Sequence, residues 1–202
     1  MGKCSADTAL RDINDLLAHG VCTVSSNGMR MTPPHPDLLA AQALAYAPCG
    51  YSVDQLQPEL ESADYAACTL LLNGLRVQYR VAKITPTKVG QFVTLWKRVG
   101  RGPIQPFEVG DPVDVFVVST RSGPRLGQFV FPKAVLAAQG VVAGVDRADS
   151  GKRALRVYPP WDTTTSRQAQ RTQAWQLQYF VDMSEGRAVD LAQVKALLAR
   201  QG

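Results

Sequence analysis

The chain has 202 residues, of which 46% are hydrophobic and 19% charged, proportions that are ordinary for a globular protein. This length is enough for one domain with a real core, so a stabilising disulfide or metal is not required. No apolar run reaches the roughly 18 residues of a membrane helix, and no apolar stretch follows Lys3 as it would in a secretory signal. We therefore expect a cytoplasmic protein of a single domain, residues 1–202, without a membrane partner.

The cysteines do not form a metal-binding pattern. Cys4, Cys22, Cys49 and Cys68 are widely spaced without a Cys-x-x-Cys pair, and the two histidines show no ligand spacing. Free thiols in a reducing compartment are the better interpretation.

The net charge of +5 hides a contrast along the chain. Residues 73–160 contain 14 Lys and Arg against five Asp and Glu, whereas the remainder contains eight against twelve. A basic segment between acidic flanks favours an anionic partner such as nucleic acid. The alternative is that these lysines guard strand edges against aggregation, and charge alone leaves both interpretations open.

The first part of the chain is predicted to be helical. Helices are expected over residues 5–19 and 37–47, separated by a loop over 25–36 that holds Asn-Gly and Pro-Pro breakers. These elements make up an N-terminal helical part, residues 1–50. Residues 52–62 are acidic and polar, and we expect a turn or two of helix there.

Strand patterns dominate the middle of the chain. Asn73-Gly74 is a strong hairpin signal between the first two strands, and the nearly continuous apolar run from Val113 is typical of a central buried strand. The predicted strands are Ala67–Asn73, Leu75–Ile84, Gln91–Arg98, Val113–Ser119, Gly127–Phe131 and Arg153–Tyr158.

Three further helices are predicted around these strands. Pro132 opens one to Ala138, Asp162 or Thr163 caps a long Gln-rich helix to about Val181, and Asp190 caps a C-terminal helix within residues 189–200. Helices, then strands, then helices indicate an α/β (α+β) fold, with a mixed, mostly antiparallel sheet flanked by helices.

Alternation along the second strand singles out Lys83. Period two places Leu75, Val77, Tyr79, Val81 and Lys83 on one face, so Lys83 ends an apolar row. A lysine in that position extends to water or meets a charged partner.

Two segments after Lys83 carry groups that suit a nucleic acid. The loop Thr85–Gln91 offers two hydroxyls, Lys88 and an amide, which are donors for phosphate oxygens. The next strand ends in Trp96-Lys97-Arg98, where an aromatic ring beside two cations suits stacking together with phosphate contact. An ordinary turn and a core tryptophan are the alternatives.

Common catalytic patterns are absent from the sequence. There is no P-loop, no dinucleotide fingerprint and no Gly-x-Ser-x-Gly elbow. Both histidines lie in the N-terminal region, which makes a Ser-His-Asp triad improbable.

Three runs resemble the MepB family: Arg80–Arg98, Gly127–Lys133 and Arg156–Asp162. The Gln-rich helix that follows them completes the resemblance, which covers a core of about residues 64–182. The resemblance implies a restriction-endonuclease-like fold, and hence nucleic-acid binding, without implying an established reaction.

Nucleases of that fold hold magnesium with an Asp near the start of one strand and an Asp/Glu-x-Lys on the next, and often add a helical Glu. In this chain the resemblance assigns those roles to Asp64, Lys83 and either Glu61 or Glu59. Val81 stands where the second strand acid is expected, so the two-carboxylate site is incomplete.

Three hypotheses therefore remain, led by a DNA-binding or other polyanion-binding protein without proven catalysis. Its phosphate contacts would be Lys83, Lys88, Gln91, Lys97, Arg98 and Lys133. The second hypothesis is a magnesium-dependent nuclease that uses Asp64, Lys83 and Glu61. The third is a binder of a small anionic or drug-like ligand in a pocket lined by Trp96, Tyr158 and Trp161.

Overall fold

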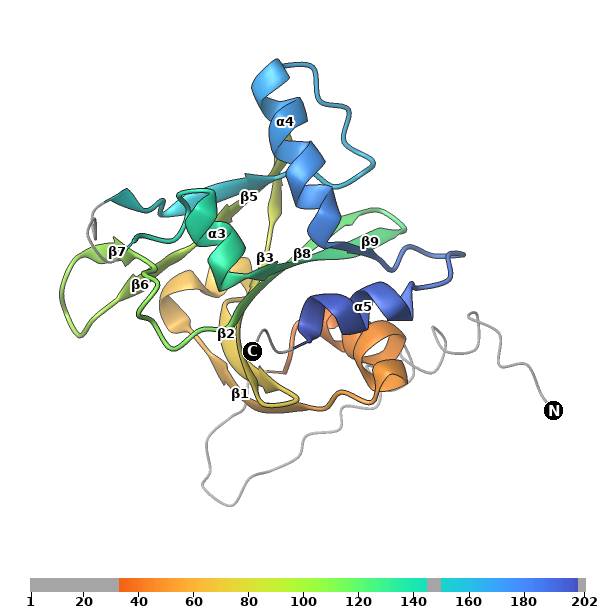
Figure 1. Ribbon diagram of the computed structural model, residues 1–202, viewed down its shortest axis with the longest axis horizontal. Coiled ribbons are helices and arrows are strands. Elements are labelled where there is room, and N and C mark those ends of the chain that lie inside the picture. Colours follow the sequence, from red (N-terminus) through yellow and green to blue (C-terminus); the bar gives the residue numbers. More distant parts are fainter. Residues whose placement is uncertain (1–32, 145–149, 200–202) are drawn as a thin grey trace.

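The computed structural model describes residues 33–144 and 150–199 (Figure 1). Three sheets are present in these ranges, and the order of strands in each follows. The largest is six-stranded: β1 (Val53–Pro58), β2 (Cys68–Leu72), β3 (Leu75–Val81), β8 (Val115–Ser122), β9 (Arg125–Pro132) and β11 (Phe180–Asp182). A three-stranded sheet contains β10 (Ala154–Val157), β5 (Lys88–Thr94) and β4 (Lys83–Thr85). The smallest pairs β6 (Trp96–Arg98) with β7 (Ile104–Pro106).

The six-stranded sheet is antiparallel except at its centre, where β3 and β8 run parallel. Residues 115–120 of β8 are all buried, as expected of a strand covered on both faces. At the entry to this parallel pair, the Asp114 carboxylate accepts hydrogen bonds from the backbone N–H of Arg76 at 2.9 Å and from its guanidinium Nη2 at 2.7 Å. The first residues of both strands are thereby fixed together.

One face of the large sheet packs against helices from both ends of the described chain. It is covered by α2 (Pro36–Ala41), its continuation η1 (Gln42–Tyr46) and η2 (Ala47–Cys49), and α5 (Leu191–Leu198) (Figure 1). Within this core the Tyr79 hydroxyl lies 2.8 Å from Ser119 Oγ, which accepts from Gln128 Nε2 at 2.9 Å. The Tyr46 hydroxyl donates to Gln128, so the buried polar groups satisfy one another.

The opposite face packs against α3 (Lys133–Ala138), α4 (Arg167–Gln176) and the three-stranded sheet (Figure 1). Phe116, Phe129 and Phe131 of the large sheet have no exposed surface and share a core with Val93 and Val157 of the small sheet. The small sheet therefore has one buried face and one outer face.

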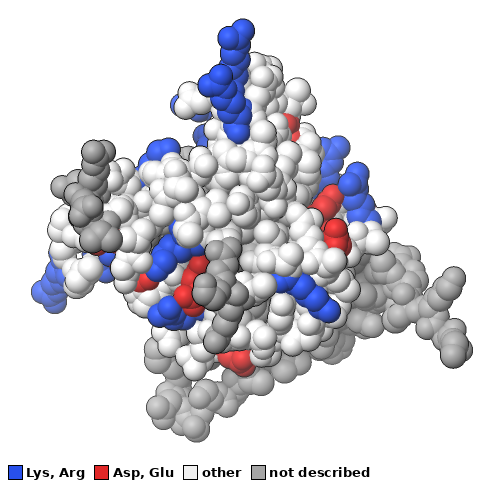
Figure 2. Space-filling model, in the orientation of Figure 1, with Lys and Arg blue, Asp and Glu red and all other residues white. Residues whose placement is uncertain are grey.

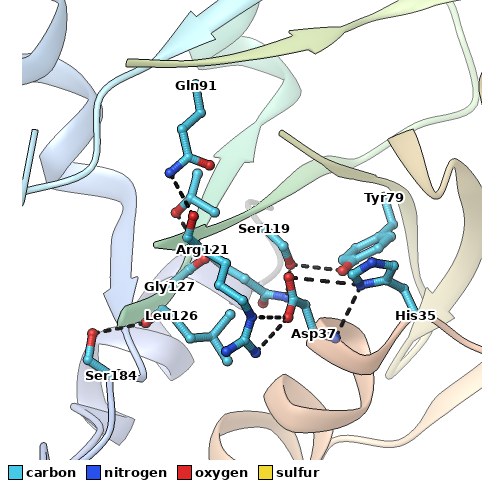
Figure 3. Close-up of polar contacts among 11 residues, drawn as sticks. His35, Asp37, Tyr79, Gln91, Ser119, Arg121, Leu126, Gly127 and Ser184 are labelled. Carbon is cyan, nitrogen blue, oxygen red and sulfur yellow. Dashed lines mark hydrogen bonds and ion pairs between the residues drawn. The ribbon is translucent and has the colours of Figure 1, made fainter. Parts of the chain in front are cut away.

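A polar chain also links the two sheets to α2. Gln91 Nε2 on β5 donates to the Arg121 carbonyl at 3.2 Å, and the Arg121 guanidinium binds the buried Asp37 carboxylate at 2.6 Å (Figure 3). These contacts fix the small sheet relative to the helices on the far side of the large one.

An ion pair between a fully buried arginine and a glutamate that is 34% exposed attaches the segment before β2 to the centre of the large sheet. The Arg80 side chain on β3 has no exposed surface and donates to Glu59 Oε2 at 2.6 Å and to the Tyr79 carbonyl at 2.8 Å. Gln78 Nε2 donates to the other oxygen of Glu59 at 2.5 Å. Glu59 directly precedes η3 (Leu60–Tyr65), so this pair fixes where η3 begins.

The predicted α/β class with a mostly antiparallel sheet is confirmed, and so are most of the strands. Asn73 and Gly74 both have positive φ, as a two-residue hairpin turn requires. The helices predicted from Pro132 and after Asp190 are present as α3 and α5. The predicted helix over 5–19 lies outside the described residues, as do Cys4 and Cys22, while Cys49 and Cys68 carry free thiols.

Several predicted boundaries are wrong. The expected helical turn over 52–62 is the strand β1 followed by η3, and the single strand Leu75–Ile84 divides at Ala82 into β3 and β4. The Gln-rich helix begins at Arg167 under the side-chain cap of Ser166 and stops at Gln176. It stops there because the buried Gln176 side chain binds β10 and the chain then pairs with β9 as β11. Within the described ranges, no helix is long and apolar enough to cross a membrane.

The pair of Glu59 and Arg80 gives a test of what holds η3. Glu59→Gln leaves the desolvated Arg80 charge uncompensated, so we expect a loss of about 3 kcal/mol in the free energy of unfolding, measured by urea titration. The matched control is Glu61→Gln, two residues on, which breaks an exposed pair with Arg98 and should cost less than about 1 kcal/mol. Equal losses in the two variants would contradict a special role for the pair of Glu59 and Arg80.

The Asp114 contact predicts a pH dependence. The hydrogen bonds from Arg76 hold the pKa of Asp114 below its ordinary value. An acid with a depressed folded pKa stabilises the fold above its unfolded pKa of about 4, and this contribution is lost as the pH falls through the folded value. Asp114→Asn should therefore lower Tm at pH 7 and have progressively less effect toward pH 2. A Tm difference that stays constant down to pH 2 would contradict this assignment.

Candidate nucleic-acid interface

The outer face of the three-stranded sheet places basic and aromatic side chains in one row. Lys83 on β4 and Arg156 on β10 are both paired with Phe92 on the central strand β5, so the three side chains lie side by side on one face. Along β5 and into β6, Val93 and Leu95 are buried in the core, whereas Phe92 and Trp96 are half-buried on the outer side.

Each of three cations on this face lies over an aromatic ring. Lys83 Nζ is 4.9 Å from the centre of the Tyr65 ring. Arg156 Cζ is 5.8 Å from Phe92, and Arg98 Cζ is 5.8 Å from Trp96. These are all the cation–π contacts of the described residues, and the Tyr65 and Phe92 rings also meet edge to face.

Two ion pairs hold η3 along this face. Glu61 accepts from Arg98 Nε at 2.7 Å, and Asp64 lies 3.9 Å from Lys83 Nζ. Both pairs are solvent-exposed, which makes them weak and sensitive to salt. The cations are thus positioned by their neighbours without being sequestered from an incoming anion.

Arg156 also fixes the loop between β4 and β5. Its Nη1 donates to Thr85 Oγ1 at 3.1 Å and to the Gly90 carbonyl at 2.8 Å. Gly90 adopts a positive φ, and a Cβ there would come within 2.6 Å of the Tyr158 ring and 3.0 Å of the Arg156 side chain. The Tyr158 ring therefore lies beside Arg156, and the exposed Lys88 projects from the first residue of β5.

Three of the predicted phosphate contacts have partners inside the protein. Gln91 is buried, and Lys133 Nζ donates to two backbone carbonyls, those of Val109 and Asp111. Lys97 Nζ binds Asp111 at 2.6 Å and Glu108 at 3.1 Å. Partial burial lowers the pKa of Lys97, but these hydrogen bonds outweigh that effect and raise the pKa above its ordinary value. We leave these three residues out of the proposed interface, because Gln91 is buried and the ammonium groups of Lys97 and Lys133 are each held by two oxygen acceptors. Arg156 is kept, since the hydrogen bonds described for it use Nη1 alone.

The residues of the nuclease hypothesis meet only in part. Asp64 and Lys83 are 3.9 Å apart but open to solvent, Glu61 is paired with Arg98, and Glu59 with the buried Arg80. Residues 33–144 and 150–199 contain no group of three His, Cys, Asp or Glu side chains that could hold a metal. The acids near Lys83 therefore act as partners of cations in this arrangement.

The aromatic residues of the ligand-pocket hypothesis lie in different places. Trp96 lies on β6 and Tyr158 at the end of β10, whereas Trp161 packs against Phe180 and borders a surface cleft of about 440 Å³. Two arginines, two acids, a serine and two prolines complete that cleft: Pro124, Arg125, Pro160, Asp182, Ser184, Glu185 and Arg187. Its wall is electrically mixed, since Arg187 already binds Asp182 at 3.1 Å.

Sequence reasoning missed Tyr65, Phe92 and Arg156 as site residues. Alternation between the buried Leu155 and Val157 gives Arg156 an outward position, so the pattern contained that signal. Its pairing with Phe92, 64 positions earlier, depends on the strand order β10-β5-β4, which no local pattern reveals.

Comparison with known proteins agrees with the resemblance seen in the sequence. The MepB-like family model matches residues 59–182. A crystal structure of MepB is 34% identical to this chain, with a TM-score of 0.61, and the match covers 65% of this chain and 87% of that one. No curated protein matches. With more than half of its length matched by the family model, the chain belongs to the MepB-like family.

Proposed function

We propose that this protein binds nucleic acid on the outer face of its three-stranded sheet. The observation that carries the proposal is that Lys83 and Arg156 lie over aromatic rings on that face, while Arg98 lies over Trp96 on the adjoining strand β6. With the exposed Lys88 at the start of β5, this region offers four cations interleaved with rings.

This combination fits the chemistry of a nucleic acid better than that of a simple anion. Lysine and arginine neutralise phosphates and release counterions, which supplies most of the non-specific affinity. Aromatic rings and guanidinium planes offer surfaces on which bases stack. A small inorganic anion would use the cations and leave the rings without a partner.

On the face of the molecule that Figure 2 shows, most basic side chains stand singly or beside acidic ones, apart from a group at the tip of α4. Arg167 and Arg171 are exposed at that end of the helix. A small cluster with defined neighbours is therefore a better candidate interface than overall charge.

The proposal does not include cleavage. Val81 occupies the position where the second strand acid would stand, and Asp64 and Glu61 are each beside a cation. The restriction-endonuclease-like fold and the magnesium-dependent reaction that the resemblance implies stay predictions.

The salt dependence of binding tests this proposal. Filter binding of labelled DNA across a salt series should give a log–log slope that becomes shallower in Lys83→Gln and Lys88→Gln. Each lost phosphate contact should change the slope by about 0.9 on duplex or about 0.7 on a single strand. Lys195→Gln removes an equally exposed lysine on α5, across the large sheet, and should leave the slope unchanged. Absence of retained DNA at low salt, or an equal change in all three variants, would refute the proposal.

A further inference from the structure

Exposed apolar side chains adjoin the pair of Arg98 and Glu61. Val99, which is 66% exposed, directly follows Arg98, and Leu60, which is 89% exposed, directly precedes Glu61. Ile84 and Val89 are also exposed, but strand alternation turns them away from Lys83 and Lys88, because Ile84 pairs with Gln91, whose side chain faces the large sheet. Val99 and Leu60 are therefore the apolar neighbours of the cations.

The aromatic rings of the face are half-buried, and they lie at separate positions along and across the strands. Phe92 and Trp96 are four residues apart along one chain direction, which corresponds to about 13 Å in an extended strand. Tyr65 comes from η3 on one side of β5, and Tyr158 from the end of β10 on the other. The rings thus form a platform across the sheet, with the cations between them.

We propose that this face takes single-stranded nucleic acid in preference to a duplex, an inference that rests on the proposed function. In a duplex the flat faces of the bases are stacked on one another and only phosphates and groove edges are presented. Such a ligand would place charged phosphates against Val99 and would leave the rings without stacking partners. A single strand has free base faces that can cover both the rings and the apolar neighbours of the cations.

The acids of η3 favour the same choice. Glu61 and Asp64 stand beside Arg98 and Lys83 on this face. Duplex DNA carries one charge for about every 1.7 Å of its length, so it would press a dense row of phosphates against these carboxylates. A flexible single strand carries half of that charge per unit length. It can place its phosphates beside the cations while avoiding the acids.

Fluorescence anisotropy with three labelled probes tests the inference: oligo-dT, oligo-U and a DNA duplex of the same length, at one salt concentration. We expect both single strands, the DNA and the RNA, to bind at least about tenfold more tightly than the duplex. A preference for one of them identifies the sugar that the site accepts, and either preference supports the inference.

Two variants separate base stacking from charge. Phe92→Leu keeps an apolar side chain in a half-buried position and should weaken single-strand binding about tenfold, with the salt slope unchanged. Val99→Ser changes a side chain that is 66% exposed, does not threaten the fold, and should weaken single-strand binding several-fold. Tyr51→Leu, a half-buried aromatic that packs on the other core, is the control and should bind as the unmodified protein does.

The outcomes distinguish the two proposals. If the duplex binds as tightly as the single strands, or if neither Phe92→Leu nor Val99→Ser affects single-strand binding, the preference for single strands is wrong while nucleic-acid binding stands. If none of the three probes binds at low salt, the proposed function itself fails. Should Phe92→Leu unfold, Val99→Ser alone decides whether apolar contact contributes.

Discussion

The fully buried guanidinium of Arg80 is the constraint around which the candidate site is built. Burial lowers the pKa of Arg80 and Glu59 opposes that shift, so the charge is tolerable only while Glu59 stays in place. Burial likewise raises the pKa of the neighbouring Cys68 to about 12, which makes its thiol unreactive. Holding Glu59 against β3 fixes the first residue of η3, and η3 then carries Glu61, Asp64 and Tyr65 over the small sheet.

The limits of sequence reasoning are clearest at Lys83. Alternation correctly predicted that Leu75, Val77 and Tyr79 share the core face of the second strand. It failed beyond Val81, because the Ala82 N–H still bonds to Ser119 in the large sheet, whereas Lys83 pairs with Phe92 in the small one. Period two describes a strand only while it stays in one sheet, and a change of sheet carries no clear signal in composition.

The basic residues show a second limit, because lysines with different surroundings in the fold were all predicted to contact phosphate. Arg98 lies at a strand end, as the sequence suggested, whereas Lys88, expected on a loop, is the first residue of β5. Lys97, next to Arg98, instead neutralises Asp111 and Glu108, which lie on the loop leading to β8. Whether a lysine is free depends on which acids the tertiary fold brings to it. The charge count of residues 73–160 therefore overestimates the charge that a partner can reach.

Under the proposed function, this division of the basic segment gives the aromatic rings of the outer face a role. With Lys97 and Lys133 committed to the fold and two acids on η3, the remaining charge is too small to bind a polyanion strongly by itself. Extra affinity then has to come from contacts that do not depend on charge. Tyr65, Phe92, Trp96 and the apolar residues around them are the available source, and they lie where the remaining cations lie.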